Sequence, residues 1–243
     1  MERYRASQLF CYFKHYLSKP ELKFIAENLT VYLHSEREDK YPLINKEDDL
    51  IVYAVPSVFC VTAAKHSLNL LRKVSIQMDK FVSNKFDIIS KHFYFDNQIG
   101  FYYSFRNEGG LEDSINYCLK QIELSKDAIH EFRTKKIENS RLIKSYKDNI
   151  DDILSDTHKS KSADSLMKKY IKDYREWILE LENFVPPPEK EYIGPEHTGF
   201  KRICIIYEKQ GKYEEAIKYA EMAKNDHWGG TWDKRIVKLE KNI

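Results

Sequence analysis

Two aspartates and one histidine come nearest, in type and position, to a catalytic or metal-binding arrangement. Asp48 and Asp49 precede the apolar residues 50–55, and paired carboxylates at a strand end hold metal ions in nucleases. No Glu-x-Lys motif follows them on another apolar run, so we expect the two aspartates to end a solvated loop. His92 precedes three aromatic residues at 93–95, a setting typical of a hydrogen-bonded packing residue rather than a ligand.

The motifs that usually mark enzymes are missing from the sequence. It contains no glycine-rich phosphate loop, no His-Glu-x-x-His, no Gly-x-Ser-x-Gly and no closely spaced histidine pair. An arginine followed four to six residues later by a histidine, which marks many helical ribonucleases, is also absent. We therefore expect a protein without catalytic residues, metal or cofactor.

The charge balance does not favour direct binding to nucleic acid. Forty basic and 38 acidic residues give a formal net charge of +2, far from the one-sided basicity of proteins that bind a phosphate backbone. The most basic stretch, residues 133–147, is interrupted by Glu138, and we interpret it as a solvated helix face. Nucleic acid is expected only indirectly, through a complex.

The cysteines and the apolar runs predict a cytoplasmic location. The cysteines are far apart and none belongs to a Cys-x-x-Cys pair, so they are interpreted as reduced packing residues: Cys11, Cys60, Cys118 and Cys204. The N-terminus has no apolar signal core, and the longest apolar run, residues 50–64, is shorter than the roughly 20 residues that span a bilayer. We expect neither secretion nor membrane insertion.

Residues 199–227 have the pattern of a helical hairpin, and an earlier segment repeats it. Apolar residues recur every three or four positions before Gly211, and small residues do so after it. Residues 97–121 align without gaps with residues 199–223, pairing Gly109 with Gly211 and keeping the small positions of the second helix small. Since one hairpin cannot bury its own apolar face, the repeat predicts a stack of hairpins.

The last hairpin resembles the tetratricopeptide repeat. The match lies at seven positions: Phe200, Ile203, Tyr207, Gly211, Tyr213, Ala216 and Ala223. The sequence departs from the pattern at Cys204 and Ala220. Residues 92–243 also resemble a group of small bacterial tetratricopeptide-like proteins. The resemblance implies a helical scaffold that binds other proteins, and it implies no chemistry.

The resemblance also implies which residues face a partner. Carried over position by position, the exposed positions of the first helix of each hairpin are Tyr103, Arg106, Asn107, Lys201, Ile205 and Lys209. A tyrosine, an arginine and two lysines suit a partner segment with an acidic or carboxylate end. Alternatively, these residues pack against the N-terminal part of the same chain.

The helical period in most of the chain predicts an all-α protein. Helices are expected over residues 3–17, 18–33, 57–82, 87–107, 111–135, 166–181 and 232–242, with a polar helix and loop reaching residue 161. Residues 34–49 are expected to form a loop and residues 160–164 a turn. Residues 50–55 suit a buried strand or a helix, and we favour the helix. Ser18 and Glu21 form a capping-box pattern, Thr231 is expected to cap the last helix, and prolines 186–188 end the helix before them.

Two regions and one function follow as expectations. Residues 1–86 form an N-terminal helical region, and residues 87–243 a tetratricopeptide-like domain with an insertion or degenerate hairpin at 137–184 and a C-terminal capping helix at 231–243. We expect a non-enzymatic protein-interaction module, an adaptor or complex subunit that binds another chain or a second copy of itself. The alternatives are an accessory subunit of a nucleic-acid-processing or bacterial defence complex and, third, an enzyme whose site lies in the N-terminal region.

Overall fold

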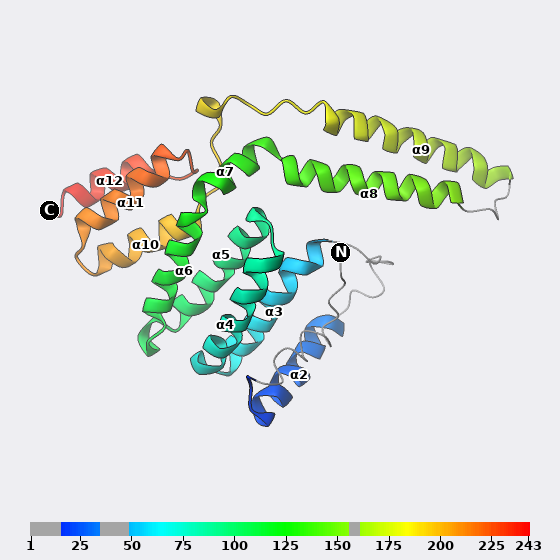
Figure 1. Cartoon of the computed structure of the whole chain (residues 1–243). Coiled ribbons are helices and arrows are strands. Elements are labelled where there is room, and N and C mark those ends of the chain that lie inside the picture. Colours follow the sequence, from blue (N-terminus) through cyan, green and yellow to red (C-terminus); the bar gives the residue numbers. More distant parts are fainter. Residues whose placement is uncertain (1–15, 35–48, 156–160) are drawn as a thin grey trace. The chain divides into compact units, whose positions relative to one another are not determined.

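The computed structural model of the chain describes residues 16–34, 49–155 and 161–243, and within these ranges the protein is all-α, which confirms the predicted fold class (Figure 1). The helices are α2 Lys19–His34, α3 Asp49–His66, α4 Leu68–Lys85, α5 Ile88–Ser104, α6 Leu111–Glu123, α7 Ser125–Thr134, α8 Lys136–Ser155, α9 Lys161–Glu182, α10 Thr198–Lys209, α11 Tyr213–Asn225 and α12 Trp232–Glu240. Two short 3-10 helices, η1 Arg106–Glu108 and η2 Glu189–Glu191, complete the elements.

The chain divides into two compact units. Unit 1 contains Met1–Ala128 and Pro195–Ile243, and unit 2 contains Ile129–Gly194. These units differ from the expected regions, because α3 packs against α5 across the expected boundary after residue 86. The insertion or degenerate hairpin expected at 137–184 lies within unit 2, which is inserted in the sequence between the two segments of unit 1.

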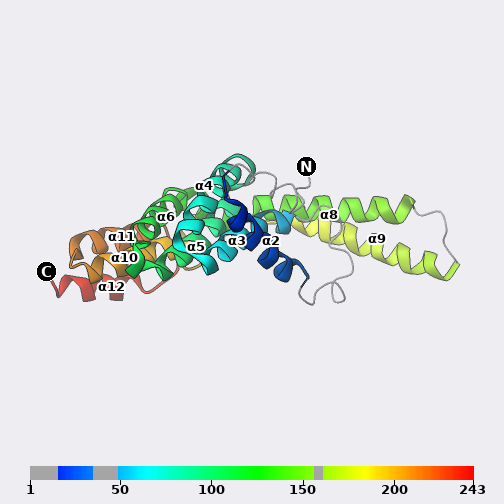
Figure 2. The ribbon, with the colours of Figure 1, turned by 90° about the horizontal axis from the view of Figure 1, so that it is seen from below.

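Unit 1 is a stack of helical hairpins. Helices α3 and α4, α5 and α6, and α10 and α11 pack in pairs, α5 contacts α3 and α4, and α10 contacts α6 and α5. Both ribbon views place α5 and α6 between α3–α4 and α10–α11 (Figures 1 and 2). Helix α12 packs on α11 at the end of the stack, as the prediction of a capping helix requires. The pair next to α5–α6 on the N-terminal side is therefore α3–α4, a hairpin that the sequence repeat did not identify.

In each of the two repeated hairpins, the two helices approach each other closely at small residues. In α5–α6 the buried Ser114 hydroxyl donates a hydrogen bond to the Ile99 carbonyl oxygen at 3.1 Å. In α10–α11 the Cys204 thiol donates to the Ala216 carbonyl oxygen at 3.2 Å, and Ala216 is fully buried. Small side chains at 114 and 216 therefore let the two helix backbones of each hairpin approach, as the alignment of the repeats predicted.

Both repeated hairpins turn on a glycine in the left-handed conformation. Gly109 has φ +94° and Gly211 has φ +72°, values that residues with a Cβ adopt only with strain. The positive φ explains why glycine stands at the same place in both copies.

Three predicted helix boundaries in unit 1 were wrong. The helix expected over 57–82 is two helices, because Ser67 has an extended backbone and its hydroxyl accepts a hydrogen bond from the Leu70 amide at 3.2 Å, which caps α4. The helix expected over 111–135 is interrupted at Leu124. The last helix ends at Glu240, and Thr231 stands at its N-cap position without a capping hydrogen bond from its side chain.

Other local predictions held or lie beyond the described ranges. Glu21 accepts the Ser18 amide at 2.7 Å, which confirms one half of the capping box, while the Ser18 hydroxyl donates to the same carboxylate. Residues 50–55 are helical, as favoured. The helix expected over 3–17 falls outside the described ranges except at its end, where residues 16 and 17 are not helical, and the loop expected at 34–49 is outside them from 35 to 48.

Unit 2 is a long antiparallel hairpin of α8 and α9 (Figure 1). Helix α9 begins at Lys161, so the predicted turn at 160–164 was wrong for 161–164. The three prolines at 186–188 follow α9, which ends at Glu182. The hairpin seam contains an aromatic cluster in which the Tyr146 ring stacks on Tyr174 at 5.4 Å and contacts Trp177 at 5.4 Å.

Candidate functional site

Three cations surround one tyrosine where α5 and η1 meet α10. The Arg202 guanidinium lies over the Tyr103 ring at 4.0 Å from its centroid, and Arg106 lies over it at 5.0 Å. The Lys209 ammonium donates a hydrogen bond to the Tyr103 hydroxyl at 3.3 Å. We call these four residues, Tyr103, Arg106, Arg202 and Lys209, the Tyr103 cluster.

Helical spacing places these side chains together. Tyr103, in the last turn of α5, and Arg106, the first residue of η1, are three residues apart. Arg202 and Lys209 are seven residues apart, which is two turns along one face of α10. Helix α10 packs directly on α5. The stacking of the repeated hairpins therefore assembles the cluster from segments a hundred residues apart.

The cations of the cluster have no acidic counter-charge in the described part of the chain. Neither Arg106 nor Arg202 nor Lys209 forms an ion pair with a described carboxylate; each is engaged with Tyr103 instead. The nearby Glu208 is occupied by Arg235 and Lys238, at 3.4 Å and 2.5 Å. Two guanidinium groups thus lie over the Tyr103 ring and one ammonium lies at its hydroxyl, an arrangement that an incoming anion would stabilise.

The pKa of Tyr103 records this local field. Partial burial raises the pKa of the phenol, but the hydrogen bond from Lys209 and the charges of Lys209 and Arg202 outweigh burial and hold the pKa below its ordinary value of 10. Every other tyrosine of the described chain with a clear shift has its pKa raised, with burial as the main cause: Tyr94, Tyr102, Tyr117, Tyr192, Tyr207 and Tyr219. Tyr103 is therefore electrostatically distinct among them.

Three of the six predicted partner-facing residues join this cluster: Tyr103, Arg106 and Lys209. The Lys201 ammonium instead pairs with Glu196 at 2.8 Å. Ile205 is half-buried on α10, and Asn107 is exposed in η1 without a hydrogen bond to the cluster within the described ranges. Arg202 was missed. It lies three residues from Ile205 and seven from Lys209, but Lys201 lies four residues from Ile205 and fits the same face, so spacing alone does not choose between the two.

The alternative, in which these residues pack against the N-terminal part of the chain, requires them to be buried. The four polar members Arg106, Asn107, Lys201 and Lys209 are exposed. Tyr103 and Ile205 are half-buried, and Arg106 and Lys209 of the Tyr103 cluster lie on the surface of the described part of unit 1.

A second group of titratable residues is buried inside unit 1. The His92 ring stacks on Trp228, with centroids 5.3 Å apart and planes 2° apart, and meets the fully buried His197 ring edge-on at 5.0 Å. The Gln121 side chain donates to the His92 carbonyl oxygen at 3.0 Å and accepts the Gly199 amide at 2.7 Å. His92 is thus a packing residue, as predicted, and its neighbour His197, which also caps α10, was missed.

Burial keeps both histidines neutral. It lowers the pKa of His92 to about 4, and burial together with the neighbouring His92 lowers the pKa of His197 to about 3. Neutral imidazoles can ligate a metal, but the described residues contain no group of three or more His, Cys, Asp or Glu placed to hold one. Of the two aspartates considered as metal ligands, Asp48 lies outside the described ranges and Asp49 is the first residue of α3.

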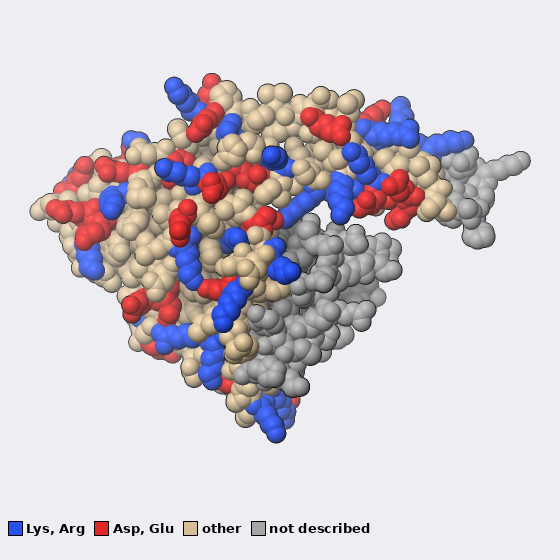
Figure 3. Space-filling model, in the orientation of Figure 1, with Lys and Arg blue, Asp and Glu red and all other residues tan. Residues whose placement is uncertain are grey.

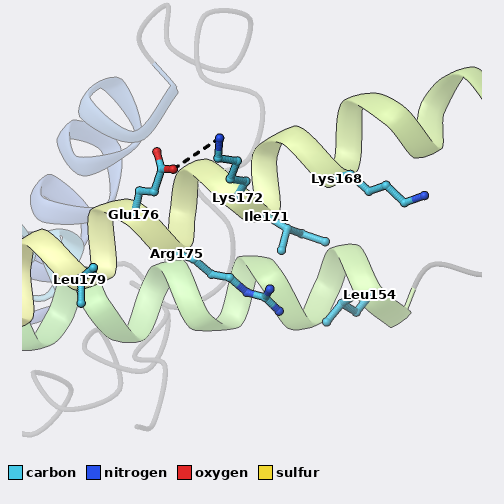
Figure 4. A pocket seen from close by; sticks show the side chains of 7 residues that line it. All are labelled: Leu154, Lys168, Ile171, Lys172, Arg175, Glu176 and Leu179. Atoms are coloured by element: carbon cyan, nitrogen blue, oxygen red, sulfur yellow. Dashed lines mark ion pairs between the residues drawn. The ribbon is translucent and has the colours of Figure 1, made fainter.

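Unit 2 has a shallow hollow of about 480 Å³ beside α8 and α9 (Figure 4). Its lining combines three cations with one carboxylate and three apolar side chains: Leu154, Lys168, Ile171, Lys172, Arg175, Glu176 and Leu179. The Lys172 ammonium pairs with Glu176 at 3.7 Å. Leu154 and Leu179 are each 60% exposed, so the hollow does not enclose a small ligand as substrate pockets do.

Comparison of the chain with protein-family models, curated proteins and solved structures gives no match. None of the described helices is long and apolar enough to cross a membrane. On the face shown in Figure 3, basic and acidic side chains alternate without a continuous region of one sign. The local geometry of the Tyr103 cluster is therefore the main functional signal.

Proposed function

We propose that the chain is a non-enzymatic protein-interaction module, and that unit 1 binds an acidic or carboxylate-ended segment of a partner chain at the Tyr103 cluster. The observation that carries this proposal is the convergence of Arg106, Arg202 and Lys209 on one partly exposed tyrosine, without a described acidic counter-charge. The resemblance of the last hairpin to tetratricopeptide repeats supports the same role.

The donors of the cluster suit a carboxylate. Each guanidinium presents several N–H groups in a planar fork that matches two carboxylate oxygens, and the Lys209 ammonium and Tyr103 hydroxyl add donors beside it. The Tyr103 ring holds Arg202 in place before the partner arrives, which reduces the entropy lost on binding. Binding would be salt-dependent, because the cluster is exposed and its charges are screened.

A charge-reversal experiment tests this proposal. Full-length protein, the Arg106→Glu/Lys209→Glu double variant and a Lys218→Glu control are each used to capture partners from native lysate. Lys218 is exposed on α11, outside the cluster. We expect one protein to be retained by the wild-type chain and the control and lost by the double variant.

The outcomes separate the alternatives. Phosphate is also an anion, so a retained partner that disappears after nuclease treatment would favour the accessory subunit of a nucleic-acid-processing or defence complex. A partner that the double variant retains as well as the wild-type chain would rule out the Tyr103 cluster as the interface.

A further inference from the structure

The α8–α9 hairpin of unit 2 buries very little of its own apolar surface. Of the described side chains in these two helices, only Ile150 and Ile178 are buried, each at 8% exposure. Helices of 20 and 22 residues derive most of their stability in water from packing of an apolar face. One buried residue on each helix leaves that packing incomplete.

Several of the apolar side chains that remain exposed lie on one side of the hairpin, whereas Leu154 and Leu179 line the hollow. On α9 Leu166, Tyr170 and Trp177 are spaced by four and seven residues, which is one helical face, and they are 51%, 47% and 44% exposed. Trp177 contacts Tyr146 of α8, and Leu142, one turn before Tyr146, is also exposed. We call Leu142, Leu166, Tyr170 and Trp177 the apolar face.

The charges of the hairpin are ordered along both helices. The first half of α8, residues 136–145, has three basic residues and one acidic residue, and the second half, 146–155, has one basic and three acidic. In α9, residues 161–171 contain three lysines and one acidic residue, whereas residues 172–182 contain two basic and four acidic residues. Each helix is therefore positive toward its N-terminus and negative toward its C-terminus.

This order opposes the helix dipole, which favours acidic residues at the N-terminus and basic residues at the C-terminus. Stability of the isolated helices therefore does not explain it. Antiparallel packing does, because it sets the positive half of one helix beside the negative half of the next. Within the hairpin the Lys147 ammonium pairs with Glu182 near the end of α9 at 3.5 Å. If a second hairpin with the same charge order packed antiparallel to this one, the positive half of each helix would lie beside the negative half of its neighbour.

We propose that two copies of the chain associate through the apolar faces of their α8–α9 hairpins to form an antiparallel four-helix bundle. In such a two-fold arrangement the same patch is used by both copies, so a self-complementary charge order is what the symmetry requires. The helices are about 30 Å long and a pair is about 20 Å wide. Face-to-face packing then buries on the order of 1,200 Å² in total, the lower end of the range of stable interfaces.

The oligomeric state of the full chain tests the proposal. We expect light scattering coupled to gel filtration to give a dimer mass for the wild-type chain at micromolar concentration. Leu166→Ser/Tyr170→Ser should give a monomer with unchanged circular dichroism. Leu179→Ser should remain dimeric, because Leu179 is 60% exposed but lies beside the hollow, off the apolar face.

A second pair of variants tests the charge order without altering apolar residues. Lys169 and Lys168 are adjacent, but Lys169 is a helical neighbour of the apolar face while Lys168 lines the hollow. We expect Lys169→Glu to weaken the dimer about tenfold and Lys168→Glu to weaken it much less, since close charges across an interface set its affinity.

A monomeric wild-type chain at 100 micromolar, a dimer that survives Leu166→Ser/Tyr170→Ser, or loss of the dimer in Leu179→Ser would overturn the proposal. Equal weakening by Lys169→Glu and Lys168→Glu would also overturn it. None of these results depends on the Tyr103 cluster, which is in unit 1.

Discussion

The two units use helical hairpins in opposite ways. In unit 1 the hairpins pack on one another, and side chains such as Ile99, Ile203 and Ala216 are fully buried. In unit 2 a single hairpin keeps most of its leucines and aromatic side chains exposed. Unit 1 therefore has a complete buried interior. The hairpin of unit 2 has an apolar face on which no other described helix packs. The same element contributes to a buried interior in unit 1 and leaves apolar side chains exposed in unit 2.

Acid should separate the two units most clearly. Both His92 and His197 have pKa values in the fold well below the 6.5 of an exposed histidine, about 4 and about 3. As the pH falls below 6.5 the unfolded chain binds protons that the folded unit 1 excludes, so stability is complete above pH 6.5 and declines as the pH falls toward 4. Between pH 6.5 and pH 5 each histidine should remove about 2 kcal/mol from the free energy of unfolding of unit 1.

Urea unfolding of Trp177→Phe protein, in which Trp228 and Trp232 report on unit 1, measures this effect. The His92→Phe/His197→Asn variant is the matched control, and its unit 1 should show a shallower pH dependence over the same interval. Equal slopes in the variant and the parent would contradict the burial argument.

Overpacking the hairpin crossing should produce the next largest effect. Ala216 is fully buried where its carbonyl oxygen accepts the Cys204 thiol, so Ala216→Leu should destabilise unit 1 by about 1 to 3 kcal/mol. In unit 2 the large-to-small change Leu179→Ala truncates an exposed side chain. It should alter the free energy of unfolding by about 0.5 kcal/mol or less. Thermal unfolding measures both, and an unchanged midpoint for Ala216→Leu would contradict the close approach of α10 and α11.

The sequence predicted the stacked hairpins better than it predicted their ends and neighbours. The period of apolar residues, the paired glycines at 109 and 211 and the small residues at 114 and 216 are local signals, and the structure places them as the alignment predicted. Ser67 was missed because the helical period of apolar residues resumes directly after it, although Lys65 and His66 in the last turn of α3 and the capping serine are signals of a helix end.

The candidate site was half predictable for the same reason. Tyr103, Arg106 and Lys209 follow from the repeat, because their positions depend on the hairpin to which they belong. Which of Lys201 and Arg202 faces Tyr103 depends on how α10 is rotated against α5, and that rotation is set by tertiary packing. His197 had no sequence signal, since its burial requires Trp228 and His92 to be brought beside it from distant segments.

Reversing charge in the Tyr103 cluster should barely affect folding. Arg106 and Lys209 are exposed, so Arg106→Glu/Lys209→Glu should change the free energy of unfolding of unit 1 by about 0.5 kcal/mol or less while abolishing capture of an acidic partner. The same samples used for capture supply the melting curves. A loss of several kcal/mol would instead show that these residues contribute to the interior of unit 1.

The smallest expected effect is a spectroscopic one confined to a single phenol. Lys209 and Arg202 hold the pKa of Tyr103 below 10, so ultraviolet titration of the wild-type chain minus Tyr103→Phe should give one tyrosinate that forms below that pH. Lys209→Ala should raise its pKa, because the variant removes the hydrogen bond and the positive charge of Lys209, which lower the pKa more than those of Arg202 do. The exposed control Lys218→Ala should leave the pKa of Tyr103 unchanged.

Occupation of the cluster by a carboxylate should also raise this pKa, since the anion neutralises the cations that stabilise the phenolate. The titration therefore reports binding at the Tyr103 cluster, and a pKa insensitive to Lys209→Ala would show that the cations and the ring are not coupled in solution.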